Sequence, residues 1–129
     1  MPSVLGLGGL HPEVRDRVSR VLERARKERL GVTVTSTFRT RAKQEQLYRA
    51  WIARGRAGLP AAPPGYSTHE YGFAVDLVAE DTPALVAIAE CEGLHWAGPG
   101  DRVHFDPFGP AAWSQITQNL RPRVPPYKC

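Results

Sequence analysis

The chain has 129 residues and a mass of 14.2 kDa, which suits a single domain. Its composition, 42% hydrophobic and 23% charged, is that of an ordinary soluble globular protein, and no apolar run approaches the roughly 20 residues that a membrane-spanning helix needs. The net charge of +4 favours polyanionic partners, but the basic residues are spread through the predicted helices, so charge alone identifies none.

The N-terminal half begins with an amphipathic pattern. Apolar residues at helical spacing predict a first helix over Pro12–Leu30, which we expect Gly31 to end. The alternating, β-branched segment Val32–Ser36 predicts a strand. A helix followed by a strand is the beginning of an α+β arrangement.

A second helix follows the first predicted strand. Thr40 is expected to cap it, and it should extend to about Arg54 with Leu47 and Trp51 facing inward. Glycine, proline and alanine dominate the next segment, Gly55–Gly65, which therefore predicts a loop.

The second half adds more strands and a third helix. Gly72–Val78 is expected to be a strand, and Thr82 to cap a helix over Pro83–Glu92. Two short apolar runs separated by Gly-Pro-Gly predict a hairpin over Trp96–Phe105. The fold class predicted is α+β, with helices packed on a small, mostly antiparallel sheet in a single domain.

The C-terminal segment is less informative. Ala111–Leu120 is a possible last helix, so we assign residues 1–120 to the domain and residues 121–129 to a proline-rich tail. The two cysteines, Cys91 and Cys129, are interpreted as a buried thiol and a tail thiol rather than as a disulfide framework.

A first candidate site lies in the predicted strand Gly72–Val78. Alternate residues of a strand share a face, so Gly72, Ala74 and Asp76 would lie together opposite an apolar face. Two small residues beside one carboxylate leave room for a cation or a donor, and His69 just upstream could supply a second metal ligand. The alternative is that Asp76 caps a turn while His69 lies at the surface.

A second candidate site lies in the predicted hairpin. Val103 and Phe105 alternate with His104, which turns the histidine away from the core. If this strand packs beside Gly72–Val78, His104 can meet Asp76 and His69. Two imidazoles, one carboxylate and an open position form a known catalytic zinc arrangement. A carboxylate at Asp101, just before the strand, could carry a proton from water to a leaving amine.

Arg39 follows the first predicted strand, at its junction with the second helix. An arginine at such a junction is often a surface residue. Close to a metal, however, it would be well placed to bind a substrate carboxylate or a developing oxyanion.

These motifs resemble a known family. The sequence is similar to the zinc peptidases that include D-alanyl-D-alanine carboxypeptidases and L-alanyl-D-glutamate endopeptidases, phage endolysins among them. The family signature SxHxxGxAxD is met by Ser67, His69, Gly72, Ala74 and Asp76. An acidic residue, two others and a final histidine form the second signature, which Asp101 and His104 meet. The similarity covers most of the chain, from about Val34 to Phe105.

The resemblance implies a role for each matching residue. It implies one Zn²⁺ ion per chain, held by His69, Asp76 and His104, with Asp101 as the general base and then the general acid. The same resemblance implies that four further residues contact the substrate: Arg39, Gln44, Ser67 and Trp96. Arg39 would also stabilise the oxyanion.

Three positions distinguish this chain within the family pattern. Lys43 stands where glutamate is more usual, and Asp106 stands where glutamate commonly follows His-Phe, which suggests a change near the ligands or at the surface. The acid–base residue is aspartate rather than glutamate, which resembles the endopeptidase and endolysin branch.

The segment at residues 1–14 does not resemble a signal peptide. We therefore expect synthesis in the host cytoplasm and action at the cell wall after release.

Several functions stay open at this point. The first is an L-alanyl-D-glutamate endopeptidase acting on peptidoglycan; the second is a D-alanyl-D-alanine carboxypeptidase; the third is a zinc-bearing, non-catalytic wall-binding module of a phage particle. Peptidoglycan is the expected partner, together with anionic wall polymers, and the protein is expected to be a monomer. A nucleic-acid binder would leave the histidine–aspartate pattern unexplained, so no nucleic acid is expected.

Overall fold

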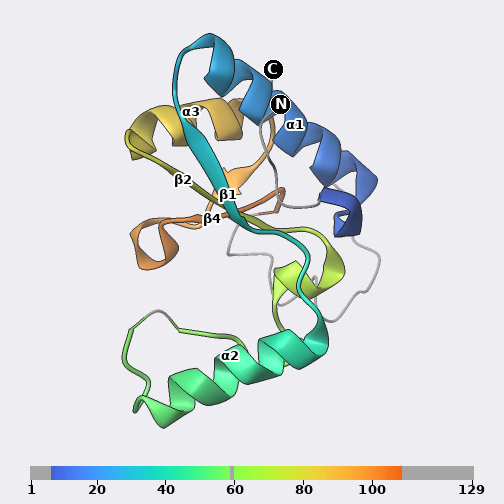
Figure 1. The fold of residues 1–129 in the computed structure, drawn as a ribbon, viewed down its shortest axis with the longest axis vertical. Helices are drawn as coiled ribbons and strands as arrows, with labels where there is room; N and C mark the ends of the chain where they lie inside the picture. Colours follow the sequence, from blue (N-terminus) through green and yellow to red (C-terminus); the bar gives the residue numbers. More distant parts are fainter. Residues whose placement is uncertain (1–6, 59, 109–129) are drawn as a thin grey trace.

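The computed structural model describes residues 7–58 and 60–108, which form helices around one small sheet (Figure 1). The helices are α1 (Pro12–Lys27), α2 (Arg41–Ala53) and α3 (Thr82–Cys91), and the strands are β1 (Val32–Ser36), β2 (Val75–Ala79), β3 (His95–Trp96) and β4 (His104–Asp106). Single 3-10 turns lie at Leu7–Gly9, Thr68–Tyr71 and Pro99–Asp101.

The four strands form one antiparallel sheet in the order β1-β2-β4-β3. The predicted α+β class is therefore confirmed, as is the hairpin that joins β3 to β4. In the register of β2 with β4, Asp76 lies opposite His104 and Val75 opposite Phe105. The sheet thus brings together two candidate ligands that the sequence places far apart.

The two faces of the sheet meet different surroundings. Val75 and Leu77 of β2 and Phe105 of β4 are fully buried in a core with the apolar faces of α1 and α3. Asp76 alternates with them and points to the opposite side. On that side lie α2 and the loop that follows it, well separated from α1 and α3 (Figure 1). The metal-binding candidates therefore lie between the sheet and α2.

Helix α1 ends earlier than the sequence predicts. Its last residue is Lys27, and Glu28 caps it. Arg29 adopts the left-handed conformation (φ 58°) that we expected Gly31 to provide. The reason is packing: Leu30 is half-buried against the core, and the N–H of Leu30 bonds the carbonyl of Ala25 at 2.8 Å. The chain must therefore turn back before it reaches the glycine.

The capping residues of the other helices are only partly as predicted. Thr40 caps α2, since its hydroxyl accepts from the N–H of Lys43 at 3.1 Å, as expected. In α3 the cap is Asp81 rather than Thr82; its carboxylate accepts from the N–H of Ala84 at 3.0 Å. Both residue types cap well, and the helix begins one residue earlier than the proline suggested.

Gly72 does not belong to a strand. It ends the 3-10 turn Thr68–Tyr71 in the left-handed conformation, with φ 76°. The predicted shared strand face of Gly72, Ala74 and Asp76 is therefore wrong, because β2 begins only at Val75 and Ala74, just before it, is fully buried. Backbone of the N-terminal segment occupies the space beside this glycine: a Cβ atom there would lie 2.9 Å from the carbonyl oxygen of Gly9.

Cys91, the last residue of α3, is bonded in a disulfide, so the expectation of a free buried thiol is wrong. The chain's other cysteine, Cys129, lies outside the described residues, as do the possible helix Ala111–Leu120 and the proline-rich tail. Among the described helices, none is long and apolar enough to cross a membrane.

Candidate metal centre

His69 is held by the 3-10 turn on which it lies. Ser67 begins this turn, and a capping box joins its side chain and backbone to Glu70. The imidazole Nδ1 of His69 lies 2.9 Å from the carbonyl oxygen of Thr37, the residue after β1. A carbonyl only accepts hydrogen bonds, so Nδ1 carries the proton and the Nε2 lone pair of His69 points into the space before β2.

His104 approaches the same space from β4. The Nε2 atom of its buried ring lies 2.8 Å from Oδ2 of Asp106 and 3.3 Å from the hydroxyl of Thr68. Donation of the Nε2 proton to the Asp106 carboxylate leaves the Nδ1 lone pair of His104 facing Asp76. The two histidines therefore present different ring nitrogens, Nε2 and Nδ1, to the same point.

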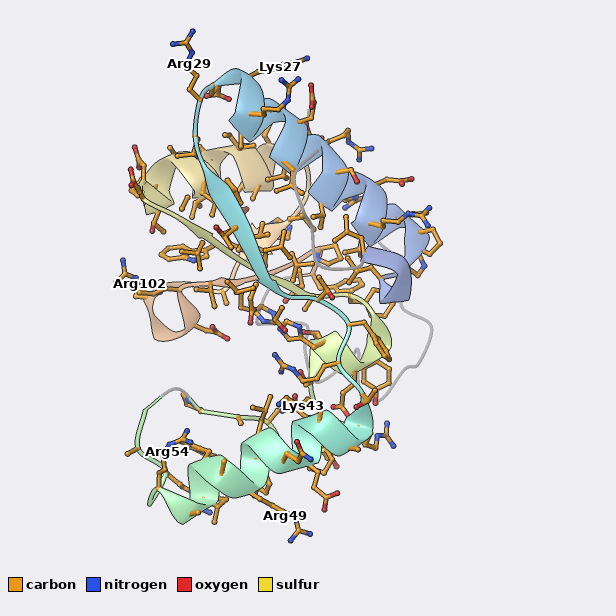
Figure 2. All side chains as sticks on the ribbon, in the orientation of Figure 1. Lys27, Arg29, Lys43, Arg49, Arg54 and Arg102 are labelled. Carbon is orange, nitrogen blue, oxygen red and sulfur yellow. The ribbon has the colours of Figure 1, made fainter. Side chains whose placement is uncertain are left out.

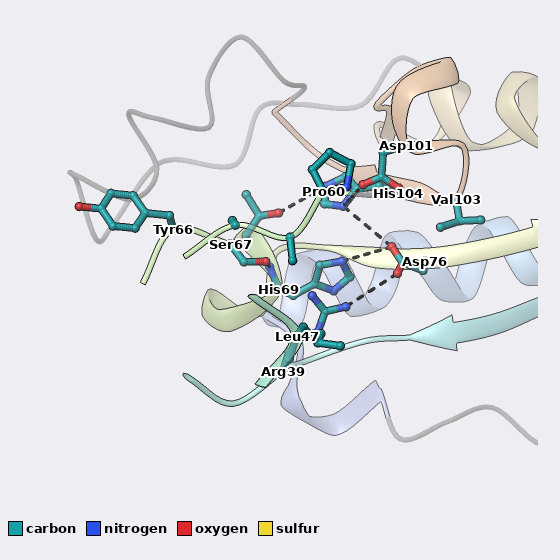
Figure 3. A pocket seen from close by; sticks show the side chains of 13 residues that line it. Arg39, Leu47, Pro60, Tyr66, Ser67, His69, Asp76, Asp101, Val103 and His104 are labelled. Carbon is teal, nitrogen blue, oxygen red and sulfur yellow. Dashed lines mark hydrogen bonds and ion pairs between the residues drawn. The ribbon is translucent and has the colours of Figure 1, made fainter. Parts of the chain in front are cut away.

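Three ligand atoms converge on that point (Figure 3). Oδ1 of Asp76 lies 3.2 Å from Nε2 of His69 and 3.9 Å from Nδ1 of His104, and all three ligand atoms lie within 4.8 Å of one another. Oδ1 of Asp76 is buried without a hydrogen-bond donor. Two lone pairs facing one buried carboxylate oxygen need a cation between them. The donor set thus fits a divalent metal such as zinc.

Arg39 lies on the other side of Asp76. Its guanidinium donates to Oε1 of Gln44 at 2.8 Å and to Oγ of Ser36 at 3.0 Å, and it lies 3.9 Å from Oδ2 of Asp76. Gln44 is buried and donates in turn to the carbonyl of Ala62 at 2.7 Å. In this structure Gln44 therefore holds the arginine and the loop after α2 in place.

Asp101 ends the 3-10 turn between β3 and β4. Its Oδ2 atom lies 3.8 Å from Nδ1 of His104, on the open side of the ligand group. Burial raises the pKa of Asp101, and the charge of Asp76 raises it further, against the opposing effect of His104. A carboxylate with a raised pKa beside a metal-bound water is suited to accept a proton.

Asp76 behaves in the opposite way. Burial alone would raise its pKa, but His69, His104 and Arg39 outweigh burial and hold the pKa below the ordinary value of an aspartate. Asp76 is therefore ionised at neutral pH, as a metal ligand must be.

A cavity of about 290 Å³ opens over these groups (Figure 3). Its polar part contains Arg39, His69, Asp76, Asp101 and His104. The remaining lining comes from α2, from the segment between α2 and the 3-10 turn, from the start of that turn and from the residue before β4. It consists of Leu47, Pro60, Ala61, Ala62, Tyr66, Ser67, Thr68 and Val103. A cavity that combines these metal-ligand candidates with an apolar wall suits the binding of a short peptide.

The described residues that line this cavity do not include two of the residues that the resemblance assigned to substrate binding, Gln44 and Trp96. Gln44 lies behind Arg39, and Trp96 packs at the border of the core with its indole N–H on the carbonyl of Arg102 at 2.8 Å. Ser67 does line the cavity. Val103, expected in the core, is half-buried and lines the cavity as well.

Sequence reasoning assigned no definite role to the groups that orient the ligands. These are the Thr37 carbonyl, Glu70 and Asp106. Asp106 had a signal, since the position after His-Phe is acidic in the family pattern, and a role near the ligands or at the surface was left open. Glu70 had one too, because Ser67-x-x-Glu70 has the spacing of a capping box, whereas the Thr37 carbonyl had none. The structure buries Asp106 completely.

An antiparallel sheet that gathers two histidines, one ionised aspartate and a second carboxylate around an open cavity defines a metallopeptidase type of site. The family model for the VanY D-alanyl-D-alanine carboxypeptidases matches residues 8–97. The chain therefore belongs to the VanY D-alanyl-D-alanine carboxypeptidase family.

Solved structures show the same fold. A variant of the vancomycin resistance D,D-pentapeptidase VanY from a VanB-type cassette, in complex with Zn(II), superposes with a TM-score of 0.69 at 19% identity, covering 92% of this chain and 84% of that chain. The L,D-carboxypeptidase DacB from Streptococcus pneumoniae gives 0.64 at 19% identity, covering 88% and 74%. The L-Ala D-Glu endopeptidase ChiX from Serratia marcescens gives 0.57 at 21% identity, covering 78% and 81%.

Proposed function

We propose that this chain is a zinc-dependent peptidase that hydrolyses the stem peptides of bacterial peptidoglycan, with the L-alanyl-D-glutamate bond as its target. The observation that carries the proposal is the convergence of two imidazole lone pairs on the donor-free Oδ1 of Asp76, with Asp101 beside them. Family membership and a relative solved with Zn(II) support the choice of metal.

The polar residues of the cavity then have distinct roles. A bound Zn²⁺ would supply Lewis-acid polarisation of a carbonyl and a lowered pKa for water. His69, Asp76 and His104 would hold it, and Asp101 would accept the proton of the attacking water at its Oδ2 and return it to the leaving amine. The guanidinium of Arg39 is positioned to stabilise negative charge on the carbonyl oxygen.

The choice of bond rests on two observations. Asp101 is an aspartate, which resembles the endopeptidase branch, and ChiX has this fold and is named as an L-Ala D-Glu endopeptidase. Among the described residues that line the cavity, Arg39 is the one arginine or lysine, and it already contacts Gln44, Ser36 and Asp76. This guanidinium can bind a carboxylate beside the cleaved bond in either substrate, so the choice rests on Asp101 and on the likeness to ChiX.

The alternative is a D-alanyl-D-alanine carboxypeptidase. The family model carries that description, and a VanY structure was solved with D-alanine-D-alanine. Purified walls treated with the protein and analysed by mass spectrometry separate the two. New D-glutamate amino termini support the endopeptidase, and free D-alanine supports the carboxypeptidase. If a chelator or Asp101→Asn leaves either product unchanged, the metal-dependent mechanism is wrong.

The charge distribution supports binding to anionic wall polymers. Residues 39–66 contain six arginines or lysines and one acidic residue, Glu45, whereas residues 67–108 contain eight acidic residues and one basic residue, Arg102. The cations Lys43, Arg49 and Arg54 lie on α2 and at its end (Figure 2). The basic residues are thus not evenly spread: α2 and its loop form a cationic lobe beside the cavity.

We expect this lobe to attract the polyanions of the wall by long-range electrostatics. Charge reversal at Arg49 and Arg54 should weaken sedimentation with intact walls at low salt and should leave cleavage of a soluble stem peptide unchanged. Charge reversal at Lys27 and Arg29, at the far end of the molecule, is the matched control. If wall binding does not change with salt, the proposal fails.

An endolysin role follows from this specificity as a further proposal. Bacteria that produce the protein in the cytoplasm should lyse when their inner membrane is permeabilised, whereas producers of Asp101→Asn should not. The disulfide at Cys91 agrees with action outside the cytoplasm, because disulfides persist in oxidising compartments. Lysis without permeabilisation would contradict release from the cytoplasm.

A further inference from the structure

Asp106 is a fully buried carboxylate close to the candidate metal site. Each of its oxygens accepts a hydrogen bond: Oδ2 lies 2.8 Å from Nε2 of His104, and Oδ1 accepts from the backbone N–H of Phe108 at 2.8 Å. A charge removed from water is strongly unfavourable unless it is hydrogen-bonded in this way. Its burial therefore calls for a function that an apolar residue could not provide.

We propose that Asp106 is a positioning residue that fixes the orientation and the tautomer of His104, so that Nδ1 is the metal-binding nitrogen. The inference rests on the proposed function in one respect, that a divalent metal binds at His69, Asp76 and His104. An ionised carboxylate only accepts hydrogen bonds, so the proton of the neutral ring lies on Nε2. The lone pair of Nδ1 then faces Oδ1 of Asp76.

The neighbouring strands hold the backbone of His104 but not the orientation of its imidazole ring. The backbone at His104 is held on both sides, because the N–H of Leu77 bonds the carbonyl of Val103 at 2.9 Å and the N–H of Ala97 bonds the carbonyl of His104 at 3.0 Å. Asp106 lies two residues further along β4, on the same face as His104. Its contact with Nε2 restrains the remaining side-chain rotation.

The two histidines are restrained by different partners. A neutral carbonyl, that of Thr37, orients His69, whereas a carboxylate orients His104. A carboxylate makes a stronger, charge-assisted hydrogen bond and makes the ring more basic toward a metal. The loss of the Asp106 carboxylate should therefore weaken zinc binding by more than any loss of folding stability accounts for.

The chain contains a matched control for this arrangement. Glu90 contacts Nδ1 of His95 at 2.8 Å and accepts from the backbone N–H of Trp96 at 2.8 Å. Glu90 thus combines a histidine and a backbone donor as Asp106 does, but His95 is not a member of the metal-binding group. Glu90→Gln reports what loss of such a carboxylate does away from the metal.

Asp106→Asn is the decisive variant. It keeps the size of the side chain, but the amide offers one oxygen to two donors, Nε2–H of His104 and N–H of Phe108. If the amide nitrogen faces His104, the ring must move its proton to Nδ1, which then cannot bind a metal. If it faces Phe108, that backbone bond is lost and the orienting charge is lost too.

The experiment measures Zn²⁺ affinity by competition with a chromophoric chelator, together with ¹⁵N NMR of the histidine rings in metal-free protein. In the parent we expect protonated Nε2 and unprotonated Nδ1 at His104. In Asp106→Asn we expect a zinc affinity that is 10- to 100-fold weaker and a population with Nδ1 protonated, whereas Glu90→Gln should change neither.

The inference is overturned if Asp106→Asn binds zinc like the parent, or if the parent itself carries the His104 proton on Nδ1. The second measurement needs no variant, so it decides the question even if Asp106→Asn does not fold. Failure of the proposed function has a different signature: in that case the parent binds zinc through the same tautomer but releases no peptide product from walls.

Discussion

Gly72 joins the turn that carries His69 to the N-terminal segment, and its replacement by alanine tests this junction. The residue has φ 76°, and an added Cβ would lie 2.9 Å from the carbonyl oxygen of Gly9 and 3.0 Å from the backbone nitrogen of His11. The N–H of His11 also bonds the carbonyl of Gly72 at 2.9 Å. Both neighbouring atoms belong to the backbone, so neither can move as a flexible side chain would.

The expected magnitude has two parts. The left-handed conformation costs an L-residue about 1–2 kcal/mol, and a stiffer unfolded chain returns about 0.4–1 kcal/mol. Displacement of the Gly9–His11 backbone adds about 1–3 kcal/mol, in the range of overpacked sites, and includes the hydrogen bond at risk. Gly72→Ala should therefore lower the free energy of unfolding by about 2–4 kcal/mol.

Two other glycines separate these contributions. Gly55 has φ 69° but no atom within 4 Å of an added Cβ, so Gly55→Ala reports the conformational part alone. Gly31 has neither a positive φ nor a close neighbour, so Gly31→Ala should be neutral or slightly stabilising. The order of stability expected is Gly31→Ala, then Gly55→Ala, then Gly72→Ala.

Urea unfolding followed by tryptophan fluorescence, with chelator present, measures all three variants without a contribution from metal. Zinc affinity is then measured for the folded proteins, and only Gly72→Ala should weaken it, because its turn carries His69. If Gly72→Ala and Gly55→Ala lose equal stability, the backbone of the N-terminal segment moves away from residue 72 at no cost. Its close approach is then not the reason for glycine at position 72.

Three further predictions concern the core, the metal and the two carboxylates. Phe105→Ala empties a fully buried site on β4 and should reduce the free energy of unfolding by about 3–5 kcal/mol in urea; a loss below 1 kcal/mol would contradict the packing. Zinc at about 100 times its Kd should stabilise the parent by about 2.7 kcal/mol in the same assay, and His69→Ala should abolish this gain. In metal-free protein, carboxyl ¹³C NMR should place the pKa of Asp101 above, and that of Asp76 below, the value of an exposed aspartate. Ionised Asp76 then stabilises the folded protein at any pH above the pKa that Asp76 has in the unfolded chain. This stabilisation is lost as the pH falls through the lower pKa of the folded protein, and Asp76→Asn should remove this pH dependence.

The local elements were predictable because local physics dominates them. The β-branched run Val32–Ser36 forms β1 with the predicted bounds, and Thr40 caps α2 because its hydroxyl reaches an N–H three residues later. The apolar face predicted opposite Asp76 is confirmed within β2, where Val75 and Leu77 are buried. Each of these signals is read within a few residues, where spacing alone sets the geometry.

The features that failed depend on contacts between distant segments. The end of α1 is set by burial of Leu30, and the close approach of Gly72 to the backbone of Gly9 joins two segments that are far apart in the sequence. The disulfide at Cys91 and the burial of Asp106 are likewise properties of the assembled chain. A sequence pattern shows which residue types are present at these positions but not which segment will be packed against them.

The two aspartates of the cavity show how the assembled site divides work between identical side chains. Asp76 has two imidazoles and a guanidinium around it, which keep its pKa low despite burial, whereas Asp101 is raised by burial and by Asp76 itself. A ligand must remain ionised, and a proton carrier must be able to take a proton near its working pH. The ionised ligand thus helps to make its neighbour the better base. The sequence pattern and the family resemblance both suggested these roles. The opposite pKa shifts of the two aspartates in the metal-free protein agree with a ligand role for Asp76 and a proton-carrying role for Asp101.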